Sequence, residues 1–270
     1  MPRPGKIEEI YSSWNPQDGG FQEHCKDCPI RDERGCRSPF FGSGTFDQNG
    51  EVDVMLIGES PGTASQNDGP FGGHSNKKDF DKSWENNIAS SFNGNSPHLH
   101  PFTEALQQKY DVYYTNLLKC NKLATPNKGD SWLPAKIIDE QEGDISSVSQ
   151  LNKVGKQQCE NYLISELIRL QPSAIVPFGG EKMVSEVYDL LGMSVPKLKS
   201  SINARKVFDI EFDDNQISGV YSGKLIPSYH FSENRFLNRI RHVDAVESES
   251  VTEAREEYWS VILEMVEKAV

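Results

Sequence analysis

The sequence contains no long apolar segment. Nowhere in its 270 residues does an apolar run approach the roughly 20 residues that would cross a bilayer. The first residues, MPRPGKIEEIYSSW, also lack the apolar stretch of a secretory signal peptide. We therefore expect a cytoplasmic protein with no membrane partner.

Basic charge is also scarce. The chain has 28 Lys and Arg against 40 Asp and Glu, which gives a formal net charge of −12. A protein that gains its affinity by neutralising many phosphates carries the opposite balance. The composition argues against tight, non-specific binding to nucleic acid, although a small local basic patch remains compatible with it.

Cysteine is too rare for a disulfide framework in a chain without a secretion signal, since there are only five. Cys25 and Cys28, in HCKDCPI, have the C-x-x-C spacing with which one turn supplies two thiolates to a metal centre. A redox pair, zinc, an iron–sulfur cluster and coincidence all fit this motif alone. Cys36, Cys120 and Cys159 follow, and the two distant cysteines could complete a four-thiolate site if the fold brings them to the first pair.

Short apolar segments alternate with amphipathic ones along the chain. VDVMLIG (52–58) and PSAIVPFGG (172–180) are typical of strands buried in a parallel sheet, and DVYYTNLLK (111–119) is rich in β-branched and aromatic residues. Residues 205–230 predict a hairpin or strand pair leading to a fourth core strand that ends at His230. Amphipathic patterns predict helices at 101–110, at 157–171, at 181–192 with Gly192 as the stop, and at 249–270.

This alternation predicts a single α/β domain over residues 1–270, a three-layer α/β/α sandwich around a short, mainly parallel central sheet. Residues 1–20, rich in Pro, Gly and Ser, are expected to form a peripheral lead-in. Residues 121–156 are polar and rich in turn formers, so we expect a long loop or insertion there.

Polar side chains follow the ends of the predicted strands. Glu59 follows the first strand, Asn116 ends the second, and His230 ends the fourth. The carboxyl ends of parallel strands meet at one edge of a sheet, where ligands bind, so these groups and Phe71 would form a polar pocket with a stacking face. Taken singly, each has a common structural explanation, such as a helix cap for Glu59 or turn chemistry for Asn116.

Several motifs occur in a recognisable order: CKDC, GESPG, DGPFGG, VYYTNLLKC, QQCENYLISELIRLQPSAIVPFGG and PSYHFSENR. In this order the chain resembles the iron–sulfur uracil-DNA glycosylases, the family-4 branch of the uracil-DNA glycosylase superfamily, from about Cys25 to Arg235. The resemblance implies a uracil-DNA glycosylase-like fold and an enzyme of base excision repair. Such an enzyme flips uracil out of DNA and hydrolyses its N-glycosidic bond, leaving an abasic site without a covalent lyase step. We expect a monomer that acts on uracil-containing DNA, with a sliding clamp as a possible further partner.

The resemblance also implies roles for individual residues. Phe71 would stack under the flipped uracil, and Asn116 would pair with the uracil edge, because a carboxamide donates and accepts at once. His230 would donate to the carbonyl oxygen that gains charge as the base leaves. Glu59 would favour the positive charge on the sugar or position the attacking water. Close backbone approach to the nucleotide would be allowed by Gly58, Ser60 and Gly62.

By the same resemblance, a [4Fe–4S] cluster would be held by Cys25, Cys28, Cys120 and Cys159. Four thiolates suit zinc equally well by geometry, so zinc is the alternative metal. The cluster would be structural, clamping the N-terminal segment onto the sheet. Cys36 is left over as a structural or incidental residue.

The chain departs from the family pattern at its first loop. The family usually has an acidic run after its GEAPG-like motif, and one acid lies where a thymine methyl would clash. This chain has TASQND, so Ser65 or Gln66 occupies roughly that place. The preference for uracil over other bases is therefore open.

The late motif and one spacing also differ. His230 is followed by Phe231 where the family has proline, and the candidates for the segment that wedges into DNA are Phe231, Arg235 and Phe236. The gap between the third and fourth cluster cysteines is longer than usual, which a surface loop would accommodate. Two other classes fit the sequence: a non-catalytic or altered-specificity nucleic-acid-binding member of the same fold, and a zinc-binding α/β hydrolase.

Overall fold

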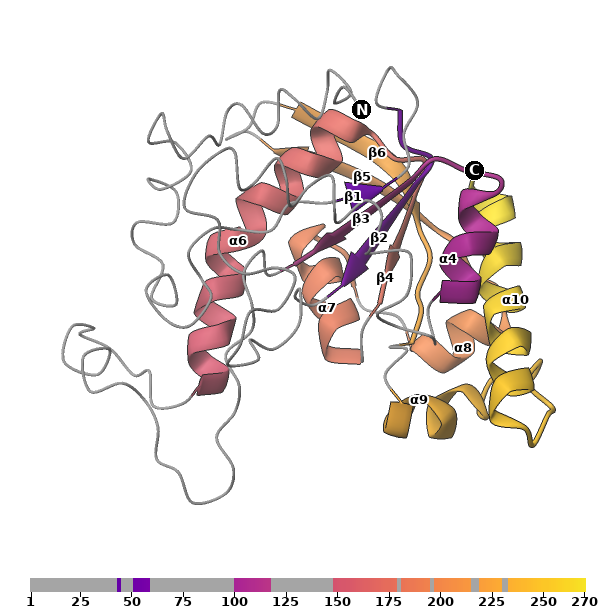
Figure 1. The fold of residues 1–270 in the computed structure, drawn as a ribbon. Helices are drawn as coiled ribbons and strands as arrows, with labels where there is room; N and C mark the ends of the chain where they lie inside the picture. The colour runs from indigo at the N-terminus through magenta and orange to yellow at the C-terminus, as the bar shows by residue number, and fades with distance from the viewer. Residues whose placement is uncertain are drawn as a thin grey trace, which may run out of the picture.

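The computed structural model describes residues 43–44, 51–58, 100–117, 148–178, 181–194, 197–214, 219–229 and 233–270. The strands in these ranges are β1 (Ser43–Gly44), β2 (Val54–Gly58), β3 (Val112–Asn116), β4 (Ala174–Pro177), β5 (Phe208–Asp214) and β6 (Gly219–Leu225). The helices are α4 (His100–Gln107), α6 (Val148–Leu170), α7 (Glu181–Leu190), α8 (Leu198–Asn203), α9 (Glu233–Ile240) and α10 (Val251–Ala269) (Figure 1). The predicted lead-in at 1–20 lies outside the described residues.

The described strands form one sheet in the order β1-β3-β2-β4-β6-β5. The four central strands run parallel, and β1 and β5 pair antiparallel at the two edges. Every residue of β2 and of β4 is buried, as expected for strands covered on both faces. The prediction of a mainly parallel central sheet is confirmed.

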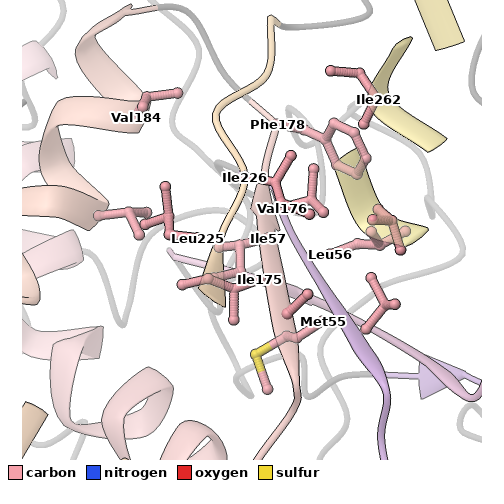
Figure 2. Packing of buried hydrophobic residues seen from close by; sticks show 14 of the residues in the cluster. Met55, Leu56, Ile57, Ile175, Val176, Phe178, Val184, Leu225, Ile226 and Ile262 are labelled. Atoms are coloured by element: carbon pink, nitrogen blue, oxygen red, sulfur yellow. The ribbon is translucent and has the colours of Figure 1, made fainter. Parts of the chain in front are cut away.

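Helices cover both faces of this sheet (Figure 1). On one face, Phe102 of α4 stacks on Trp259 of α10 with ring centroids 4.4 Å apart, and both rings meet Phe178 edge-on. Figure 2 shows Ile262 of α10 on this side and Val184 of α7 on the opposite side. Each fully buried side chain of this size stabilises the fold by about 1.5–3 kcal/mol, so the two apolar interfaces hold the three layers together.

The helix α6 begins earlier than its apolar pattern indicates. Residues 148–156, predicted as part of the long loop, belong to the helix, and residues 121–147 lie outside the described ranges. Lys156 is buried, and its Nζ lies 2.7 Å from Oε2 of Glu186 on α7. The first part of α6 is therefore fastened by an ion pair between helices, which an apolar periodicity cannot indicate.

The predicted hairpin is present, but its place in the sheet differs from the prediction. β5 and β6 pair antiparallel from Phe208↔Leu225 to Asp214↔Gly219, and β6 is itself the core strand beside β4. The fourth core strand therefore ends at Leu225 and not at His230, because the second arm of the hairpin already supplies the parallel partner. The chain then continues through a single bridge between Phe178 and Ser228.

The remaining helix predictions are largely confirmed. α4, α7 and α10 fall within three residues of the expected ranges, and Gly192, with a φ of 66°, follows the end of α7 as expected. α8 was not predicted, and α9 contains Arg235 and Phe236. None of the helices within the described ranges is both long and apolar enough to span a membrane.

Candidate functional site

The carboxyl ends of β2 and β3 lie side by side at one edge of the sheet. Gly58 pairs with Asn116 in parallel register, and the Leu117 N–H donates to the Gly58 carbonyl at 2.8 Å. β4 flanks β2 on its other side, where the Phe178 N–H donates to the Ile57 carbonyl at 2.7 Å. From the end of β2 the chain goes on to β3 on one side, and from the end of β4 it goes on to β5 and β6 on the other side. Such a reversal of direction between neighbouring strands opens a binding crevice beyond the strand ends.

Asn116 is a buried amide at this edge. Its residue is 0% exposed, and within the described part of the chain neither Nδ2 nor Oδ1 has a hydrogen-bond partner. Buried side-chain amides are nearly always paired, because leaving one unpaired costs about 1–3 kcal/mol. The amide therefore marks a place where a ligand with both a donor and an acceptor would be stabilised.

Gly58 makes room for this amide. A Cβ at Gly58 would lie 2.5 Å from Asn116 Oδ1 and 2.6 Å from the Tyr114 hydroxyl, both far inside contact distance. Tyr114 and Asn116 are two residues apart in one strand, so their side chains lie on the same face of the sheet. The absent side chain of Gly58 thus leaves room for two side chains of β3. That Gly58 also lets the protein backbone approach the nucleotide stays a prediction.

The other face of β3 is held by a buried carboxylate. Glu166 of α6 is 0% exposed and accepts hydrogen bonds from the Tyr113 hydroxyl at 2.7 Å and from the Thr115 hydroxyl at 2.9 Å. Because Tyr113 and Thr115 alternate with Tyr114 and Asn116, the helix fixes one face of the strand while the other presents the amide.

The approach to the predicted histidine lies along the same sheet edge. The Ser228 hydroxyl donates to the Pro177 carbonyl at 2.9 Å, and the Tyr229 N–H donates to the Tyr258 hydroxyl at 2.7 Å. Since β4 separates β2 from β6, the end of β2, the end of β4 and the segment before His230 follow one another along that edge.

A comparison with models of protein families identifies the family of this chain. The family model of the uracil DNA glycosylase superfamily matches residues 46–248, which include all the strand ends described above. The chain belongs to the uracil DNA glycosylase superfamily. No match is found among curated proteins. Membership in this superfamily supports a glycosylase-type hydrolase that acts on DNA.

With the superfamily known, the predicted site residues divide into two groups. The structure places Gly58 and Asn116 next to each other, and it places Cys159 as a buried residue of α6. Arg235 and Phe236 lie in α9. Outside the described residues lie Glu59, Ser60, Gly62, Phe71, His230, Phe231, Cys25, Cys28 and Cys120. Within the ranges that the structure covers, no group of three His, Cys, Asp or Glu is placed to hold a metal.

Sequence reasoning missed Tyr114 and Glu166. Glu166 stands in the run NYLISELIRL, where the neighbouring Leu163 and Leu167 are buried, so a carboxylate on an apolar helix face was a usable signal. The two-residue spacing of Tyr114 and Asn116 indicates a shared face. That both lie against Gly58 depends on the register between β2 and β3, which the sequence does not give.

Proposed function

We propose that this member of the superfamily is a uracil-DNA glycosylase of the iron–sulfur type, which flips uracil out of DNA and hydrolyses its N-glycosidic bond. The buried, unpaired carboxamide of Asn116 carries the proposal. Uracil presents an imide N–H beside a carbonyl oxygen, so Oδ1 would accept from the first while Nδ2 donates to the second. Cytosine presents the opposite pattern at these two atoms and would need the amide to be reversed.

The chemical step is assigned to residues that adjoin this edge. Glu59 directly follows Gly58, and His230 directly follows Tyr229. His230 donates to the base oxygen that becomes negative as the bond breaks, and Glu59 stabilises the cationic sugar or orients the attacking water. Phe71 stacks against the flipped base. Arg235 and Phe236 of α9, with Phe231 before it, contact the DNA.

Release of free base from oligonucleotides tests this function. Matched duplexes carry uracil, thymine opposite guanine, or hypoxanthine, and abasic product is cleaved by alkali. We expect product from uracil, with a loss on the order of 100-fold in kcat/KM for Asn116→Ala, because both hydrogen bonds to the base are removed. Asn161→Ala, on the exposed side of α6, is the matched control and should retain full activity.

Each outcome of this assay has a definite meaning. Product from hypoxanthine or mispaired thymine in place of uracil would show that the base preference has changed, as the TASQND segment allows. An intact, folded protein that releases no base from any duplex would refute the catalytic function and leave a nucleic-acid-binding role. Glu59→Ala and His230→Ala should each abolish turnover while leaving the unfolding midpoint unchanged.

We further propose that Cys25, Cys28, Cys120 and Cys159 hold a [4Fe–4S] cluster. Cys159 is buried in α6, and β3 ends shortly before Cys120 in the sequence, which supports a site between these two elements. The cluster would act as a structural clamp and takes no part in the hydrolysis. Iron and sulfide analysis of anaerobically purified protein should find both, with Cys159→Ser losing iron and Cys36→Ser retaining it. Zinc without sulfide would contradict the cluster.

A further inference from the structure

A second polar group of β3 lies beside the Asn116 amide. The Tyr114 hydroxyl is 2.6 Å, and Asn116 Oδ1 is 2.5 Å, from the same point, the ideal Cβ position of Gly58. The two groups are not bonded to each other, since Oδ1 has no partner within the described residues. They are close neighbours on one face of one strand, at the sheet edge to which the proposed function assigns the base.

The neighbouring tyrosine shows that this placement is particular to Tyr114. Tyr113 is buried, whereas Tyr114 is partly buried, and the Tyr113 hydroxyl donates to Glu166 on the opposite face of the sheet. The strand therefore carries one phenol that fastens α6 and another beside the amide. The two tyrosines are adjacent in one strand and face opposite sides of the sheet, so Tyr113 serves as a control for the loss of a phenol hydroxyl from β3.

The protonation state of Tyr114 fits a hydrogen-bond donor. Desolvation by burial raises the pKa of the Tyr114 phenol to about 12, so the group stays neutral and keeps its proton throughout the physiological range. A neutral phenol beside a carboxamide can donate a hydrogen bond to the same carbonyl oxygen that accepts one from the amide N–H group. In a site shielded from water such a donor stabilises the charge that develops on the oxygen as the base departs.

We propose that Tyr114 is a second base-contacting residue, whose hydroxyl donates to the carbonyl oxygen next to the N–H group that Asn116 binds. The inference rests on the proposed function and extends its substrate class. The preferred base has an unblocked N–H beside a C=O, because a base lacking either atom would leave a buried polar group of the protein unpaired.

A double-mutant cycle between protein and substrate tests the contact. Wild type, Tyr114→Phe and Tyr113→Phe are each assayed on duplexes with uracil or 4-thiouracil, in which sulfur replaces the carbonyl oxygen and accepts hydrogen bonds poorly. We expect Tyr114→Phe to lower kcat/KM for uracil about tenfold or more and to lose little further on 4-thiouracil. Tyr113→Phe should lower the urea midpoint and lose the same factor as wild type on changing to 4-thiouracil.

The cycle separates the two proposals. If wild type releases uracil and the effects of Tyr114→Phe and of 4-thiouracil simply multiply, the contact is refuted and the proposed function stands. If wild type releases no uracil, the proposed function fails and this inference fails with it. Tyr114→Met also removes the hydroxyl and should show the same coupling between its loss and the change to 4-thiouracil. Agreement between the two variants excludes a folding defect peculiar to Tyr114→Phe as the cause.

Discussion

At the scale of single residues, Gly58 is a position where one added methyl group would collide with the candidate site. An alanine there would place its Cβ 2.5 Å from Asn116 Oδ1, so either the amide or the strand end must move. We expect Gly58→Ala to destabilise the protein by about 1–3 kcal/mol and to reduce uracil release at least tenfold. Urea unfolding and single-turnover base release measure the two effects.

Gly192→Ala is the matched control for this substitution. Gly192 has a φ of 66° but has no atom within 4 Å of its ideal Cβ, so an alanine would be strained without touching anything. We expect a cost of about 1 kcal/mol from the backbone alone, with unchanged base release. Equal losses of activity in the two variants would contradict the proximity argument for Gly58.

At the scale of elements, Glu166 joins α6 to β3 through two hydroxyl groups. Glu166→Leu removes both acceptors from a buried site, and we expect it to lower the free energy of unfolding by about 2–4 kcal/mol. Glu166→Gln keeps one acceptor oxygen and should be affected less. Urea unfolding measures both variants, with Asn161→Ala on the exposed side of the same helix as control. Equal midpoints for Glu166→Leu and wild type would show that the pair of hydrogen bonds contributes no net stability.

The elements that sequence predicted well are those whose signal is local. β2 and β4 are uninterrupted apolar runs, and α7 has an apolar stripe followed by Gly192. The start of α6 was missed because the contact found in residues 148–156 is an ion pair of Lys156 with a later helix, which apolar periodicity does not indicate. The end of the fourth core strand was misplaced because the sequence does not show that β6 pairs with both β5 and β4.

The same distinction applies to the candidate site. The parallel arrangement of the predicted strands placed Asn116 at the carboxyl edge of the sheet, where β3 ends beside β2. Neither the strand pattern nor the order of the motifs could show that Tyr113 and Thr115 face α6, or that the Tyr114 hydroxyl lies beside Gly58. These assignments depend on strand register and on which helix covers which face, and both are properties of the folded sheet.

At the scale of the whole molecule, several tyrosines with raised pKa values make the stability of the fold decrease at alkaline pH. Burial raises the pKa of Tyr114 to about 12 and raises those of Tyr188, Tyr221 and Tyr258 further. In the unfolded chain these groups ionise near pH 10, so between pH 10 and 12 unfolding releases protons that the folded state retains. Their contribution to stability is fully present below pH 10 and is lost as the pH rises through this window.

Urea midpoints between pH 8 and pH 11.5 measure this loss. We expect a plateau up to about pH 9.5 and a steepening decline above it. Tyr221→Phe should lessen the decline, because it removes one of the phenols that the folded state keeps protonated. A midpoint that stays constant to pH 11.5 would show that the phenols ionise alike in the folded and unfolded chains.

The strand order has a consequence for how the molecule is made. β2 pairs with β3 and with β4, both distant in the chain, whereas β5 and β6 are joined by a short hairpin. Such non-local pairings close large loops and form slowly, so the hairpin is the fast-forming part of the sheet. During synthesis from the N-terminus, β2 has only one of its neighbours until residues 174–177 leave the ribosome. A nascent chain stopped before that point would expose one unpaired edge of an apolar strand, and such an edge is a site for aggregation or for binding by a chaperone.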